Sequence, residues 1–157
     1  MNGFRKPSPI SERLLKMMIE YMSNGPRGPS EVDDFEDFDL HIYSNASNGT
    51  WIRMLHALEA RIPDVEIRFH RTTGELAERI FSHNLSKPLL ILVESDVDFE
   101  QLLALGNWLH GLRIILVLHK SDLKTLSLSH TLRPRVLFYP PVDFAAIASV
   151  VGKMISK

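Results

Sequence analysis

From residue 40 onward, apolar residues follow two spacings that alternate along the chain. Some short runs are wholly apolar or alternate apolar with polar residues, as β-strands do. Between them, apolar residues recur three or four positions apart, which is the spacing of one helix face. The predicted strands are residues 40–43, 65–69, 89–93, 114–118 and 135–139. The predicted helices open at Asn48 or Thr50, at residues 72–75, at Asp96, at Leu123 and after a cap at Asp143.

This alternation predicts an α/β fold, because strands that alternate with helices form a parallel sheet covered on both faces. The runs at 89–93 and 114–118 are wholly apolar and are expected inside the sheet. The run at 65–69 alternates and is expected at an edge. The pattern therefore predicts a flavodoxin-like, doubly wound, five-stranded parallel sheet in the order 2-1-3-4-5, with an extra N-terminal helix.

The N-terminal part of the chain is predicted to be an appendage to this domain. Residues 9–23 have apolar side chains at helical spacing, among them Leu14, Met18 and Met22. We expect this face either to dock on its own domain or to serve dimerisation or another protein, because a short helix alone is marginal in water. The predicted units are a helix with a Pro/Gly linker (1–30), an acidic linker (31–38) and an α/β domain (39–157).

The acidic linker is a cluster of carboxylates interleaved with Phe35 and Phe38. Its spacing lacks the alternating ligands and the central glycine of a calcium loop. We interpret it as a solvated segment with two aromatic anchors and not as a metal site.

Composition narrows the class of protein without indicating a function. The 157 residues are 45% hydrophobic and 24% charged, and the formal net charge of −1 argues against a nucleic-acid binder. The absence of cysteine excludes disulfides, thiolate zinc sites and cysteine nucleophiles. No apolar run approaches the roughly 18 residues of a membrane span. The first residues lack the apolar core of a signal peptide, so we expect a cytoplasmic protein without a membrane partner.

Two stretches of the α/β domain resemble a known family. They read FHRTTGELAERIFSHNLSKPLLILVES (69–95) and VLFYPPVDFAAIASVV (136–151). Together with the pattern of elements, they make residues 39–157 similar to the CheY-like receiver domain of response regulators in bacterial two-component signalling. The resemblance implies a role in signal transduction and a phosphorylation site at the carboxyl ends of the strands.

The chemical positions of a receiver are filled by other residue types in this chain. Receivers hold Mg²⁺ with two acidic residues after the first strand and accept the phosphoryl group on an Asp after the third. A Thr or Ser after the fourth strand senses the phosphate, and a Lys before a proline after the fifth strand clamps it. The corresponding residues here are Ser44 and Asn45, Glu94, Leu118 with His119, and Pro140.

These departures predict a pseudo-receiver that does not use aspartyl phosphorylation. Phosphoryl transfer needs a nucleophile, a metal and a cation, and the metal ligands and the lysine are missing from these positions. A shifted register with Asp96 as the acceptor moves that carboxylate two residues beyond the strand and away from the crevice. Glu94 is then either a solvated carboxylate or a permanent mimic of a charged acceptor. We expect no enzymatic activity, no cofactor and no metal.

Other candidate chemistry is weaker. The seven histidines show no metal-ligand spacing, and we interpret them as surface or half-buried side chains. His119 is the exception, because with Glu94 and Ser44 it would form an acid/base cluster at the strand ends. The loop at 45–50 has one glycine and no P-loop lysine, so a capped turn is favoured over a phosphate cradle. Both tryptophans lie at apolar helical positions and are predicted core residues.

We therefore predict a non-catalytic signalling module that binds either a protein partner or a second copy of itself, in which case it forms a homodimer. By resemblance, its contact face includes residues 123–132, Tyr139 and the last helix. The alternative is a small-molecule or nucleotide-binding flavodoxin-like domain that uses the crevice near Asn45, Glu94 and His119. A DNA-binding regulator ranks last. The candidate partner residues are Leu14, Met18, Met22 and Tyr139.

Overall fold

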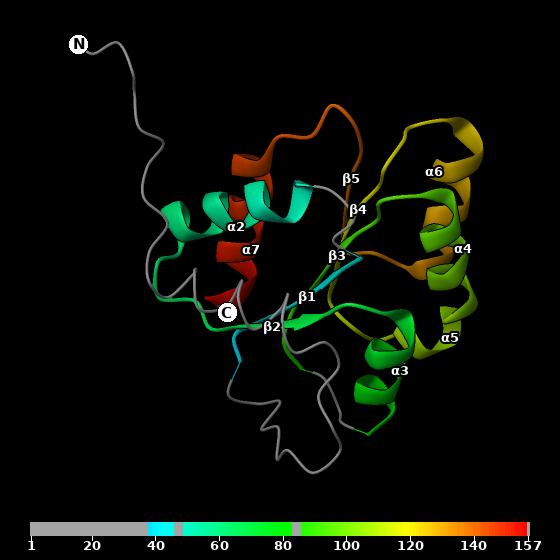
Figure 1. Cartoon of the computed structure of the whole chain (residues 1–157), viewed down its shortest axis with the longest axis horizontal. Helices are drawn as coiled ribbons and strands as arrows, with labels where there is room; N and C mark the ends of the chain where they lie inside the picture. The colour runs from blue at the N-terminus through cyan, green and yellow to red at the C-terminus, as the bar shows by residue number, and fades with distance from the viewer. Residues whose placement is uncertain (1–37, 46–48, 83–85, 157) are drawn as a thin grey trace.

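A computed structural model describes residues 38–45, 49–82 and 86–156, in which strands alternate with helices (Figure 1). The predictions for residues 1–37, including Leu14, Met18 and Met22, lie outside these residues, and the division into units stays a prediction. The elements are β1 (Leu40–Ser44), α2 (Thr50–Arg61), β2 (Ile67–His70), α3 (Thr73–Ser82), β3 (Leu89–Leu92), α4 (Asp96–Ala104), α5 (Gly106–Leu109), β4 (Ile114–Val117), α6 (Leu123–Ser129), the 3₁₀ helix η2 (His130–Leu132), β5 (Val136–Phe138) and α7 (Phe144–Ile155).

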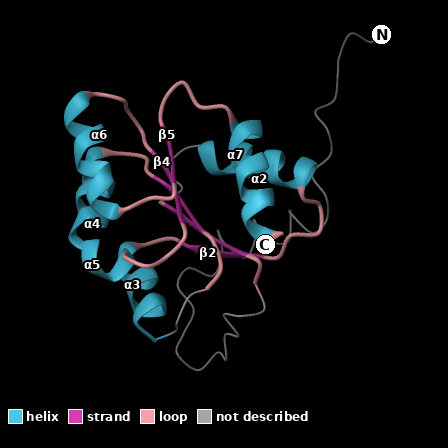
Figure 2. Ribbon diagram, turned by 180° about the vertical axis from the view of Figure 1, so that it is seen from behind, coloured by secondary structure: helices cyan, strands magenta, loops and turns pink. Residues whose placement is uncertain are grey.

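The strands form one five-stranded sheet in the order β2-β1-β3-β4-β5. Every neighbouring pair is parallel, with Ile42 of β1 opposite Phe69 of β2 and Leu90 of β3. The predicted fold class, strand order and edge position of β2 are confirmed. Figure 2 shows α2 and α7 on one face of the sheet and α3, α4, α5 and α6 on the other. All five strands therefore end at the same edge, where ligand sites of such sheets lie.

Each face of the sheet has its own hydrophobic core, because successive strand residues point to opposite faces. Leu90 and Leu92 of β3 pack under α2 and α7, whereas Leu89 and Ile91 pack under the opposite helices. All four are buried, as predicted for a strand covered on both sides. Burial of one such side chain contributes about 1.5–3 kcal/mol.

The third predicted helix, which opens at Asp96 and whose apolar spacing runs on to Leu112, is interrupted, and this corrects the prediction. α4 ends at Ala104 and α5 begins at Gly106. The amide of Trp108 donates to the carbonyl of Leu105, a tighter turn than an α-helix makes, where Gly106 and Asn107 favour a helix weakly. The break leaves Trp108 50% exposed, so its predicted core position is wrong, whereas Trp51 is buried as predicted.

Other boundaries shift by a few residues. The predicted fourth helix divides into α6 and η2, and β5 is confined to three residues. Asp143 caps α7 as predicted, whereas Gly49 stands at the N-cap of α2. No helix within the described ranges is long and apolar enough to cross a membrane.

Two histidines form a buried pair under the helices on the α3 side. His41 of β1 and His70 of β2 are both fully buried, so the prediction of surface or half-buried positions is wrong for them. Nδ1 of His41 and Nε2 of His70 lie 3.1 Å apart, and the rings are stacked. The two facing nitrogens are polar partners for each other, as buried polar groups require.

Candidate functional site

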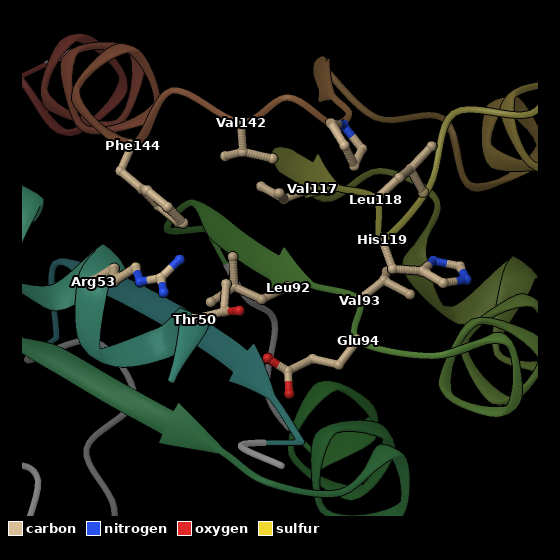
Figure 3. A pocket seen from close by; sticks show the side chains of 11 residues that line it. Thr50, Arg53, Leu92, Val93, Glu94, Val117, Leu118, His119, Val142 and Phe144 are labelled. Carbon is tan, nitrogen blue, oxygen red and sulfur yellow. The ribbon is translucent and has the colours of Figure 1, made fainter. Parts of the chain in front are cut away.

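A pocket of about 320 Å³ opens at the carboxyl edge of the sheet (Figure 3). It lies between the ends of β3 and β4 and the first turns of α2 and α7. Small-molecule sites in sheets of this type occupy the same edge. The lining residues are Thr50, Arg53, Leu92, Val93, Glu94, Val117, Leu118, His119, Pro140, Val142 and Phe144.

The structure brings four of the six predicted site positions to this pocket. They are Glu94, Leu118, His119 and Pro140. Ser44 and Asn45, in contrast, do not line it. Ser44 is fully buried at the end of β1, and Asn45 is exposed just beyond it.

The turn that carries Glu94 is fixed by a buried aspartate. The backbone N–H of Glu94 donates to Oδ2 of Asp98 at 3.1 Å, and the hydroxyl of Tyr43 in β1 donates to Oδ1. Asp98 also donates its own N–H to the Ser95 hydroxyl, which caps α4. Asp98 is 1% exposed, so it acts as an internal bridge between β1 and the turn after β3. Sequence reasoning missed it, although Ser95 followed three residues later by Asp98 fits the spacing of a helix start.

Asp96 lies outside the pocket and is paired with two residues of the loop after β4. Its Oδ1 lies 2.7 Å from Nε2 of His119 and 2.9 Å from Nζ of Lys120. These hydrogen bonds, first that of His119 and then that of Lys120, lower the pKa of the Asp96 carboxyl. Asp96 in turn raises the pKa of Lys120. The carboxylate is 66% exposed and does not face the crevice.

The predicted acid/base cluster of His119, Glu94 and Ser44 is not assembled. Figure 3 shows the imidazole of His119 turned away from Glu94. The ring contacts Phe99 and forms a hydrogen bond with Asp96, both on α4. The carboxylate of Asp96 therefore holds the imidazole on the side that faces away from Glu94. Ser44 points into the protein interior at the end of β1.

The residues at the receiver's metal-binding positions do not fit Mg²⁺. This ion prefers carboxylate oxygens and water in octahedral geometry. Glu94 supplies one carboxylate, whereas Ser44 supplies a buried hydroxyl and Asn45 an exposed amide. Over residues 38–45, 49–82 and 86–156, no three His, Asp or Glu side chains gather into a group that could hold a metal ion.

The cation at the pocket comes from a different element than in a receiver. Pro140, which precedes Pro141 across a cis peptide bond, stands where receivers have a lysine. Arg53 of α2 instead contributes a guanidinium to the pocket wall, beside Thr50 one turn earlier. Sequence reasoning missed Arg53. The spacing of Thr50 and Arg53 places both on one helix face and was the available signal.

Comparisons with known proteins identify the fold. No protein-family model and no curated protein matches the chain. Solved structures similar to it include a CheY-like response regulator receiver domain protein from Methanospirillum hungatei JF-1, with a TM-score of 0.56 and 16% identity over 74% of this chain and 92% of that chain. The signal receiver domain of a DNA-binding response regulator from Colwellia psychrerythraea 34H matches with a TM-score of 0.55 and 12% identity, over 77% and 100% of the two chains. A response regulator receiver protein from Pseudoalteromonas atlantica matches with a TM-score of 0.54 and 14% identity, over 74% and 96%.

Proposed function

We propose that this protein is a signal-transduction module of the receiver type that acts through protein–protein contacts and without aspartyl phosphorylation. The proposal assigns it no catalytic reaction. It rests on the receiver fold together with the loss of the receiver's chemical groups at the carboxyl edge.

The pairing of Asp96 carries the proposal. This aspartate follows the acceptor position by two residues, yet it bonds to His119 and Lys120 outside the pocket. Glu94 stands at the acceptor position, and Ser44, Asn45 and Pro140 occupy the positions at which a receiver has its acidic pair and its lysine. Phosphoryl transfer depends on positioning and on neutralising the developing charge, and both are compromised here.

Exposed apolar side chains support a contact role for the face formed by α6 and β5. Leu123 and Leu128 of α6 are exposed, Leu123 to 81%, and Tyr139 just beyond β5 is 48% exposed. Large apolar side chains left exposed on a surface are candidates for contact with a partner. This is the face at which the resemblance places partner contacts.

Treatment with acetyl phosphate and Mg²⁺ tests the absence of phosphorylation. We expect the intact mass of the protein to stay unchanged, while a phosphorylatable receiver treated in parallel gains one phosphoryl group. The Glu94→Asp variant should also stay unmodified, because it restores the acceptor type without the metal ligands or the lysine. A stable aspartyl phosphate on the unaltered chain would overturn the proposal.

A second candidate function is small-molecule or nucleotide binding in the pocket. The observation that favours it is the guanidinium of Arg53 at the pocket wall, which has no hydrogen-bonding or charged partner among the residues that the structure describes. A bound molecule would then regulate the module in place of a phosphoryl group.

A further inference from the structure

We propose that the pocket at the carboxyl edge binds a small apolar amino acid, with the ligand's carboxylate on Arg53 and its ammonium group on Glu94. The inference rests on the second candidate function and names the class of ligand. It follows from the two opposite charges on the pocket wall and from the apolar surface beside them.

Arg53 provides the anion-binding end of the pocket. Figure 3 shows its side chain reaching from the first turns of α2 toward the pocket. The guanidinium forms no hydrogen bond or ion pair with any residue in the described ranges. Such a group offers paired N–H donors that match the two oxygens of a carboxylate.

Glu94 provides the opposite charge. Its carboxylate lies on the other side of Thr50 from Arg53, and its backbone is fixed by the hydrogen bond to Asp98. A half-buried carboxylate attracts an ammonium group and repels a phosphate. The pocket therefore disfavours nucleotides, whose phosphates bring several negative charges, and favours a molecule with one charge of each sign.

Apolar side chains form much of the rest of the pocket wall, where they can meet the side chain of the ligand. Leu92 and Val117 come from the strand ends, and Val142 and Phe144 from the start of α7. The volume of about 320 Å³ lies near the lower end of the roughly 300–1,000 Å³ typical of ligand pockets. It suits one small molecule with an apolar side chain, and it is too small for a dinucleotide.

Amide NMR spectra of the full chain test the proposal, with L-leucine and L-phenylalanine as probes. Isocaproate, which is leucine without the ammonium group, and isopentylamine, which is leucine without the carboxylate, are the matched analogues. AMP tests for a nucleotide. We expect saturable shifts of the amide signals of Val93, Leu118 and Phe144 with at least one amino acid. Each analogue should bind at least about tenfold more weakly than that amino acid.

Charge-removing variants test the roles of the two residues. Arg53→Gln and Glu94→Gln should each weaken amino-acid binding about ten- to hundredfold. Arg61→Gln at the end of α2 and Glu100→Gln, at an exposed position of α4, remove the same kinds of charge outside the pocket and should leave binding unchanged. Thermal melting of each variant shows whether it is folded.

The possible outcomes separate the proposals. Equal binding of leucine and isocaproate, or unchanged binding in Glu94→Gln, would overturn the assigned ligand class. Binding of AMP without binding of either amino acid would overturn that class but leave the second candidate function standing. No saturable response to any probe would overturn both, while the phosphorylation result would stand in every case.

Discussion

His41 and His70 show how the fold changes the chemistry of single residues. Burial lowers the pKa of His70 well below its ordinary value, and the neighbouring His41, Arg68 and Arg79 lower it further. Arg68 is itself buried and lies over the ring of Phe38. A proton added to His70 would meet both desolvation and repulsion. The native state therefore keeps this imidazole neutral.

We predict that His70 makes the protein sensitive to acid. The unfolded state takes up this proton near pH 6.5, whereas the folded state resists it, so the stabilisation is complete above pH 6.5. It is lost as the pH falls from 6.5 toward the lowered pKa, by up to about 1.4 kcal/mol per pH unit. Urea unfolding across this range should show a smaller loss for His70→Gln than for the unaltered chain. The control is His130→Gln, at an exposed position, which should lose stability with falling pH as the unaltered chain does. An equal dependence of the unfolding free energy on pH in His70→Gln and the unaltered chain would contradict the prediction.

At the scale of elements, Asp143 caps the N-terminus of α7, as the sequence predicts. Oδ1 of Asp143 accepts hydrogen bonds from the amides of Ala145 at 3.0 Å and Ala146 at 3.2 Å. α7 packs against α2, and its buried residues complete the core on that face. The cap therefore also sets the position of Phe144 in the pocket wall.

Removal of this cap should weaken the fold by a measurable amount. Asp143→Ala leaves the two amides without their acceptor and should cost about 0.5–2 kcal/mol in the free energy of unfolding. Asp143→Asn keeps an acceptor and should cost less. Asp64→Ala, in the exposed turn after α2, removes a carboxylate that caps no helix, and it serves as the control in the same urea titration. An equal loss at Asp64 would show that the cap is not the cause.

The elements that sequence patterns predict well are those in which one periodicity dominates. β3 and β4 are wholly apolar, and their place inside the sheet follows directly from that. The break between α4 and α5 was not predictable, because the leucines keep helical spacing through Gly106 and Asn107. In the site, the positions of Glu94 and Pro140 followed from the element ends. The orientation of His119 did not, since it depends on Asp96 from a different segment.

At the scale of the whole molecule, two helical layers enclose one sheet, and the pocket and the exposed face lie in different places. The pocket is formed by strand ends with α2 and α7, whereas Leu123 and Leu128 lie on α6 across the sheet. The surface proposed for a small ligand is therefore separate from the surface proposed for a protein partner. The sequence predicts a further apolar face on a helix at residues 9–23, which lies outside the described residues.

We predict that the apolar face at Leu14, Met18 and Met22 is covered by its own domain, by a second copy of the chain or by another protein, because a short helix alone is marginal in water. If a second copy covers it, light scattering should give a homodimer for the full chain and a monomer for a chain that starts at Glu31. Met18→Glu in the full chain should have the same effect as the truncation. A monomer in every case would mean that the face serves its own domain or another protein.

The contrast between Trp51 and Trp108 has an optical consequence. Trp51 is buried beside Phe69, next in the chain to Thr50 of the pocket, whereas Trp108 is half exposed on the opposite layer. An ionic quencher in solution reaches the second indole far more readily than the first. The intrinsic fluorescence of the chain therefore divides into two populations, one from each side of the sheet. With Trp108 quenched, the remaining emission reports on the layer that holds the pocket, without any attached dye.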